Sequence, residues 1–487
     1  MRSCLLLLAL VLLGAGETPR TGAYKTTFAE RHPESEYPRM RLRYGWGEPT
    51  KEALYNIATE EFDVYVPPSY DGTVAYGLMV YTSAGQGGNS GMYRAAMDKH
   101  RLIWIGATNV PNERNVVPRW GLSLDAVWNM GKRYRLDPRR IYATGMSGGG
   151  RCASTVAPAY ADVFSGALYL VGCNPPMWPP EKQVGKPIRQ LALGNRYALM
   201  TGSDDFNRPG TKSLFDSMRS QGFKHVEYFE EPGLGHAHPS AEWFDKGVTF
   251  VDQPLREEAA ALLAQAKATE AKKPYDACRV YRSLASDFPI AVEAVAEAQQ
   301  RLAAMIPAVD EALRGELAKL ATVGAEKQRA FVARAAGFPC EAEARVLAEA
   351  SGDKELIALQ AAPGGATAAK LAKYLEAWTG YACAGKAGEA YDALAATALE
   401  PLSAQAAGKR GKPLAKYLKD WQACPSRTRA EELLEGDLAA EVEAILAIDK
   451  VPTRGTKLQQ FAKAWPGTRA AAKAEAALKE LAAAQGK

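Results

Sequence analysis

Residues 136–150 read LDPRRIYATGMSGGG and set a serine among glycines directly after an apolar run. The run Ile141–Thr144 has β character, and a helix-compatible segment, 151–164, follows the glycines. Small residues on both sides of Ser147 let a strand and a helix approach closely, and the turn between them lifts a hydroxyl above the sheet. This strand–turn–helix context predicts that Ser147 is a nucleophile and not only the polar residue of a glycine-rich turn.

The sequence up to about residue 255 alternates short apolar or β-branched runs with amphipathic stretches. Continuous apolar runs are typical of strands buried on both faces, and strand–helix alternation indicates a mostly parallel sheet covered by helices. The predicted strands are residues 77–82, 102–108, 140–145, 167–172, 197–202 and 225–231, and two predicted helical stretches are 123–134 and 213–222.

A serine hydroxyl needs a base, and hydrolases of this architecture order the chain as serine, acid and histidine. Two of the five histidines precede Ser147, and His225 opens a predicted strand. His236 and His238 remain, in the loop PGLGHAHPS that follows this strand. We favour His236 because Gly-Leu-Gly gives the loop freedom to approach Ser147. His238 is the alternative base, or a residue that contacts substrate or solvent.

The acid is expected after another strand, between the serine and the histidine. The segment 197–210, YALMTGSDDFNRPG, offers Asp204 and Asp205 in the loop after a predicted strand. We favour Asp205 on loop geometry and keep Asp204 as the alternative. The carboxylate would orient the imidazole and stabilise its charged form.

An oxyanion hole requires backbone N–H groups that point at the developing negative charge. One is expected from Gly148, the residue after the nucleophile. The other is expected from Ala84 or Gly85, because both follow the predicted strand 77–82.

The segment LDPRRIYATGMSGGG resembles that of α/β-hydrolase esterases of the polyhydroxybutyrate depolymerase-like group, which includes secreted feruloyl- and acetylxylan-type esterases. The resemblance covers roughly residues 40–255. It implies carboxylic-ester hydrolysis through an acyl-enzyme, with Ser147, Asp205 and His236 as the triad. The family often carries His-Gly after the third strand, where this chain has Thr82-Ser83-Ala84-Gly85.

The substrate is constrained less. A small-molecule or polysaccharide-linked ester is expected, and Trp120 and Trp178 are candidates for an aromatic substrate rim because they fall in or beside predicted loops. Arg151 and Arg208 could bind an acidic group of the substrate, or be solvated or salt-bridged.

Beyond about residue 255 the chain becomes rich in Ala, Leu, Glu and Lys, with helical periodicity and an internal repeat. A period near 43 residues predicts stacked helical hairpins and loosely resembles degenerate tetratricopeptide repeats. Such a region is a candidate binding site for a protein partner. The aromatic anchors recur 50, 43, 43 and 44 residues apart, at Tyr281, Phe331, Tyr374, Tyr417 and Phe461.

The N-terminus predicts export. Arg2 and the apolar run 5–13 outline a signal peptide, residues 1–16, too short to span a membrane. We therefore expect a catalytic domain over 17–255, a repeat domain over 256–487, no transmembrane segment after signal removal, and a secreted, periplasmic or cell-envelope location.

Export permits disulfides among the six cysteines that follow the predicted leader. Cys152 and Cys173 would be neighbours, either bridged or as two buried thiols. No Cys-x-x-Cys or Cys/His cluster indicates a metal site, and no cofactor is expected. The formal charge of +5 is dispersed, which argues against nucleic-acid binding.

Two other functions compete with a serine esterase. One is a serine peptidase on the same fold. The other is a non-catalytic envelope or surface scaffold that uses the helical repeats.

Overall fold

A computed structural model describes residues 19–180, 185–362, 367–422 and 424–484. The predicted leader, residues 1–16, lies outside them. The chain forms two compact units that divide between Ile306 and Pro307.

The first unit contains an eight-stranded sheet with the order β1-β2-β4-β3-β5-β6-β7-β8. Strands β3 to β8 pair in parallel, whereas β1 and β2 join the β4 edge in antiparallel fashion. The bounds are Gly22–Thr27 (β1), Glu61–Val66 (β2), Tyr76–Thr82 (β3), Leu102–Ala107 (β4), Leu136–Met146 (β5), Gly166–Leu170 (β6), Arg196–Gly202 (β7) and His225–Glu231 (β8).

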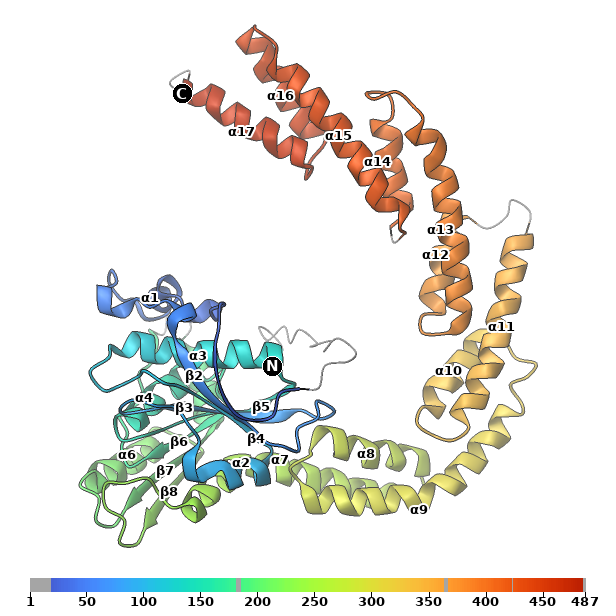
Figure 1. Cartoon of the computed structure of the whole chain (residues 1–487). Helices are drawn as coiled ribbons and strands as arrows, with labels where there is room; N and C mark the ends of the chain where they lie inside the picture. The colour runs from blue at the N-terminus through green and yellow to red at the C-terminus, as the bar shows by residue number, and fades with distance from the viewer. Residues whose placement is uncertain (1–18, 181–184, 363–366, 423, 485–487) are drawn as a thin grey trace. The chain divides into compact units, whose positions relative to one another are not determined.

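Helices cover both faces of this sheet (Figure 1). α3 and α4 contribute to the larger apolar core on one face, which contains Trp120 and Val156, whereas α2 and α7 pack on the other through Met97 and Phe244. The helices of this unit are Tyr37–Tyr44 (α1), Arg94–His100 (α2), Val116–Arg133 (α3), Gly148–Ala159 (α4), Lys186–Gly194 (α5), Arg208–Ser220 (α6), Ala241–Thr269 (α7) and Pro274–Asp287 (α8). The arrangement is an α/β-hydrolase fold, and the predicted fold class is confirmed.

A buried ion pair fixes α7 beneath the central strand β5. Arg140 of β5 donates to Asp252 of α7 with Nη2 2.7 Å from Oδ2, and Tyr142 donates to the other carboxylate oxygen at 2.6 Å. Both charged side chains are almost completely buried. Burial alone would raise the pKa of Asp252, but Arg140 and the surrounding donors hold it below its usual range.

The change in sequence composition near residue 255 coincides with a change of core. Val251 belongs to the core beneath the sheet, whereas Leu255 opens a separate apolar cluster formed with α8. The helix α7 nevertheless runs unbroken through this point, and the first compact unit continues to Ile306. The predicted boundary at 255/256 thus falls where the apolar core changes, although the first compact unit continues beyond it, and the domain boundary stays a prediction.

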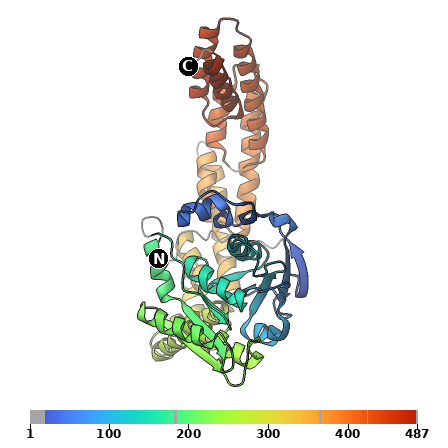
Figure 2. The same cartoon turned by 90° about the vertical axis from the view of Figure 1, so that its left-hand side faces the viewer.

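The second unit is entirely α-helical over its described residues, and its helices follow one another as hairpins (Figure 2). In each hairpin, a shorter helix that carries the aromatic anchor packs against a longer helix. The helices are Val292–Leu317 (α9), which crosses the division between the units, Ala325–Ala335 (α10), Glu341–Ala361 (α11), Ala368–Ala377 (α12), Ala382–Ser403 (α13), Gly411–Asp420 (α14), Ser426–Leu446 (α15), Val451–Ala464 (α16) and Arg469–Ala484 (α17).

Two of these repeats share the same internal geometry. The hydroxyl of Tyr374 donates to the carbonyl of Gly352 at 2.8 Å, and that of Tyr417 donates to Ala395 at 2.9 Å, each across 22 residues. The rings of Trp378 and Trp421 lie at matching positions beside their tyrosines, with centroids 5.9 and 6.1 Å away. The 43-residue period is therefore a structural repeat as well as a sequence repeat.

No helix in the described part of the chain is long and apolar enough to cross a membrane.

Candidate active site

Ser147 lies on a sharp turn between β5 and α4. Its φ of 55° and ψ of −116° are strained backbone angles for a non-glycine residue, and the small glycines on both sides leave room for this turn. A Cβ on Gly149 would lie 1.9 Å from the Thr82 carbonyl oxygen, and one on Gly145 would lie 2.4 Å from the Gly149 backbone. Only glycine fits at these two positions. The glycines of GMSGG therefore let β5, the turn and α4 pack closely together, as the sequence predicts.

His236 lies within hydrogen-bond distance of both predicted partners. Its Nε2 is 2.8 Å from Ser147 Oγ, and its Nδ1 is 2.8 Å from Asp205 Oδ1. These three residues come from three loops at the carboxyl ends of β5, β7 and β8, which the parallel sheet brings to one edge. The structure thus brings together the three residues favoured on chain order and loop position.

Asp205 is buried and held by donors other than the histidine. The Thr201 hydroxyl donates to its Oδ2 at 2.8 Å, and the Asn207 backbone N–H donates to its Oδ1 at 3.0 Å. Neighbouring Asp204 is exposed and accepts from the Ser203 hydroxyl. The geometry therefore selects Asp205 over Asp204.

His238, the alternative base, lies elsewhere. Its Nδ1 is 3.4 Å from the Tyr93 hydroxyl, and its ring lies near those of Tyr81 and Tyr93. Partial burial there lowers the pKa of His238. His236, and not His238, is the histidine at Ser147.

Backbone donors near Ser147 form a candidate oxyanion hole. The N–H of Gly148 belongs to the first turn of α4, where no intrahelical acceptor exists. Ala84 has fixed peptide groups on both sides, because the Ser83 carbonyl accepts from Arg119 and the Ala84 carbonyl accepts from the Asn112 N–H. The Gly85 N–H already donates to Ser83 Oγ at 3.1 Å, which favours Ala84 as the second donor.

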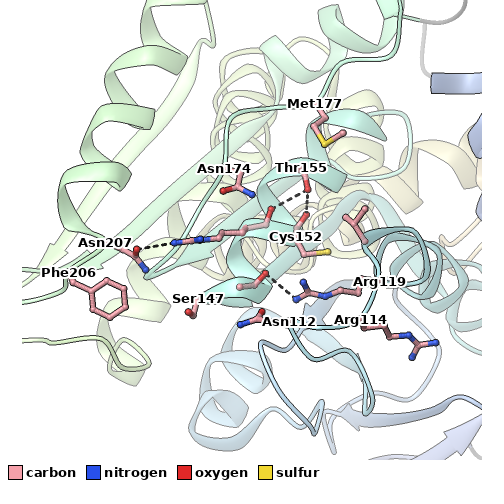
Figure 3. A pocket seen from close by; sticks show the side chains of 13 residues that line it. Asn112, Arg114, Arg119, Ser147, Cys152, Thr155, Asn174, Met177, Phe206 and Asn207 are labelled. Atoms are coloured by element: carbon pink, nitrogen blue, oxygen red, sulfur yellow. Dashed lines mark hydrogen bonds between the residues drawn. The ribbon is translucent and has the colours of Figure 1, made fainter. Parts of the chain in front are cut away.

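Arg119 of α3 donates hydrogen bonds to both backbone segments that form the candidate oxyanion hole. Its Nη2 lies 2.9 Å from the Ser83 carbonyl oxygen and 3.1 Å from that of Gly148. One guanidinium therefore fixes the loop after β3 against the start of α4. Figure 3 shows the Arg119 side chain among the residues that line the pocket at Ser147.

A pocket of about 580 Å³ opens at Ser147. Its edge includes Phe206, whose exposed ring lies over His236 with centroids 4.1 Å apart. The pocket is lined by Asn112, Arg114, Val116, Arg119, Ser147, Gly148, Arg151, Cys152, Thr155, Asn174, Met177, Phe206 and Asn207 (Figure 3).

The predicted aromatic rim requires correction. Trp120 is fully buried within α3 and donates to the Thr155 hydroxyl at 3.1 Å, so it is a core residue. Trp178 stacks on Phe223 and is not among the described residues that line the pocket. The preceding residue, Met177, lines it instead.

The hypothesised disulfide is also absent from the structure. Cys152 and Cys173 both carry free thiols, and burial raises the pKa of each to about 11. The structure therefore agrees with two separate thiols, of which Cys152 is buried and Cys173 is half-buried. The other four cysteines of the described chain are free as well. Among the described residues, no group of three His, Cys, Asp or Glu side chains is placed to hold a metal ion.

Three features of the site were missed from the sequence: Arg119, Asn112 and the ring of Phe206 over His236. The partners of Arg119 are backbone carbonyls from loops far apart in the sequence, and no pattern reveals them. Phe206 was detectable in principle, because it directly follows the predicted acid.

Comparisons with known proteins give likenesses of structure only. No family model and no curated protein sequence matches the chain. Esterase 2 of Thermogutta terrifontis phosphorylated by paraoxon aligns at 14% identity and TM-score 0.32, over 50% of this chain and 95% of that one. The S-formylglutathione hydrolase FrmB of Staphylococcus aureus aligns at 14% identity and TM-score 0.31, over 48% and 96%. A ferulic acid esterase aligns at 13% identity and TM-score 0.33, over 47% and 97%.

Proposed function

We propose that this protein is a serine esterase that hydrolyses carboxylic esters through an acyl-enzyme on Ser147. The observation that carries the proposal is the hydrogen-bonded chain from Ser147 Oγ through His236 to Asp205, with both contacts at 2.8 Å. A serine in a strained turn, a base in contact with it and a buried carboxylate behind the base are the parts that acyl transfer needs.

In the proposed reaction, His236 Nε2 takes the proton of Ser147 as Oγ attacks the ester carbonyl carbon. The N–H groups of Gly148 and Ala84 stabilise the oxyanion of the tetrahedral intermediate. The intermediate then collapses, and His236 returns the proton to the leaving alcohol. A water molecule activated by the same histidine attacks the acyl-enzyme and releases the acid.

Hydrolysis of 4-nitrophenyl acetate and butyrate tests this proposal, with Ser147→Ala alongside. The variant should lose at least about a thousandfold in kcat, because loss of a serine nucleophile removes the covalent route. Equal, background-level rates for the two proteins would contradict the esterase. If peptide amides were cleaved and esters were not, the serine-peptidase alternative would hold. If both proteins were inert on esters and peptides, the scaffold alternative would hold.

We further propose export across a membrane by the N-terminal leader, and a protein-binding role for the helical repeats. The aromatic anchors in these repeats are buried in their own hairpins, so a partner would contact the outer helix faces. Cell fractionation tests the location, and crosslinking in the intact cell tests the partner.

A further inference from the structure

We propose that the ester substrate carries a negatively charged group, such as a carboxylate, that Arg119 and Arg151 bind beside Ser147. This inference rests on the proposed esterase function and names its substrate class. Three arginines line the pocket, and its described lining contains no aspartate or glutamate.

One of the three arginines is neutralised within the protein. Arg114 forms a bidentate pair with Glu60, with contacts of 2.9 and 2.5 Å. Its guanidinium points away from Ser147 (Figure 3). The positive charge available to a ligand therefore comes from the other two.

Arg119 is a buried cation without a carboxylate partner in the described structure. It is 7% exposed, and its Nη2 donates to two backbone carbonyls, those of Ser83 and Gly148. Its Nε is buried and has no hydrogen-bond partner among the described residues. A buried charge is costly unless it is paired, and an anionic group in the pocket would supply the pair.

Arg151 brings a second charge to the same pocket from the first turn of α4. Its backbone N–H donates to the Ser147 carbonyl at 3.0 Å, so its position is fixed relative to the nucleophile. Its side chain is exposed and donates to the Asn207 amide oxygen at 3.1 Å, and it makes no ion pair within the described chain. Arg208, by contrast, pairs with Glu230 at 2.9 Å and does not line the pocket.

The chemistry of these groups suits a carboxylate. A guanidinium presents its donors as a planar fork that binds both carboxylate oxygens at once. The amide groups of Asn112 and Asn174 line the same pocket and add neutral hydrogen-bonding capacity. An ester with an anionic substituent would therefore gain contacts here that a neutral ester of the same size would not.

The test compares 4-nitrophenyl hexanoate with the mono-4-nitrophenyl ester of adipic acid, which has the same chain length and ends in a carboxylate. A second pair, 4-carboxyphenyl acetate and its neutral methyl ester, places the charge on the alcohol side. We expect kcat/KM to favour the charged member of at least one pair by about tenfold, as for a charge-assisted contact, and the preference to shrink with added salt. Arg151→Gln should lower kcat/KM for the charged ester more than for its neutral partner, and so remove most of that preference.

Arg208→Gln is the matched control, because it removes the same charge from a nearby arginine outside the pocket. It should leave the preference unchanged. Equal rates within both pairs for the wild type, or an equal effect of the two arginine variants, would overturn the proposal while the esterase function stood.

If no ester is cleaved at all, calorimetric titration of the Ser147→Ala protein with hexanoate and with hexanamide, its neutral analogue of the same length, decides the question without catalysis. Tighter binding of hexanoate that is lost in Ser147→Ala/Arg151→Gln supports the anion site. Equal or undetectable binding of the two compounds refutes it.

Discussion

Replacing Asp205 by Asn separates the charge of this residue from its geometry. In the structure, Oδ1 accepts from both His236 Nδ1 and the Asn207 N–H, whereas Oδ2 accepts from the Thr201 hydroxyl. An asparagine oxygen can take the first position, and its NH₂ can donate to the hydroxyl in the second. The imidazole orientation and tautomer should therefore survive, and only the negative charge is lost.

The cost follows from the ion pair that would form when His236 is protonated. At an effective dielectric constant near 20, a charge pair about 4 Å apart contributes about 4 kcal/mol. At about 1.4 kcal/mol per decade, this predicts a loss of about a thousandfold in kcat for Asp205→Asn. KM should change little, because Asp205 does not belong to the described lining of the pocket.

Steady-state hydrolysis of 4-nitrophenyl butyrate measures both constants, with thermal unfolding as the folding control. Asp204→Asn removes the same charge from the adjacent, exposed position and should leave kcat within about twofold. A folded Asp205→Asn protein that keeps more than a third of the wild-type kcat would refute the reasoning. So would an equal loss in the Asp204 variant.

Three stability predictions follow from the same structure. Burial lowers the pKa of His32 to about 4, and its Nδ1 accepts from the Glu34 N–H, so the folded state prefers the neutral ring. As the pH falls, the unfolded state binds the proton before the folded state does, so the free energy of unfolding should fall by about 2 kcal/mol between pH 7 and pH 4.5 in urea titrations. His32→Asn, which keeps a neutral cap, should reduce that fall, and an unchanged pH dependence in this variant would contradict the role of His32. Asp252→Asn leaves the buried Arg140 without a carboxylate partner and should lower the free energy of unfolding by about 3–5 kcal/mol, whereas Asp216→Asn, in an exposed pair with Lys212, should lower it by less than about 1 kcal/mol. Similar losses in the two variants would show that burial is not the cause. Gly149→Ala places a methyl group 1.9 Å from the Thr82 carbonyl oxygen and should abolish folding or severely lower the melting temperature. Gly131→Ala meets open space within α3 and should stabilise the protein by up to about 1 kcal/mol. A normally stable Gly149→Ala protein would contradict the close approach of Gly149 to the Thr82 carbonyl.

The central strands were predictable because their apolar runs are continuous. All six predicted runs are strands, and β8 has the predicted bounds, 225–231. The two antiparallel strands β1 and β2 were not predicted. β1 alternates half-buried and exposed residues as GAYKTT, and β2 begins with Glu-Phe-Asp, so neither has the continuous apolar run of a buried strand.

The side chains around the nucleophile were harder to predict than the nucleophile itself. Trp120 lies just before the predicted helix 123–134, and hence in or beside a predicted loop, whereas α3 begins at Val116, where Asn115 caps the helix by accepting from the Val117 N–H. Arg119 lies in the same first part of α3, before the predicted helix 123–134. Its role depends on the Ser83 and Gly148 carbonyls, which only the folded chain brings together.

Covalent labelling tests the central claim most directly. A reactive serine should be phosphorylated by paraoxon, with release of one equivalent of 4-nitrophenol and a diethylphosphoryl adduct on the peptide that contains Ser147. The account predicts that Ser147→Ala abolishes this adduct and that His236→Ala slows its formation strongly, whereas His238→Ala forms it at close to the wild-type rate. A protein that forms no adduct, or one whose adduct persists in Ser147→Ala, would contradict the account.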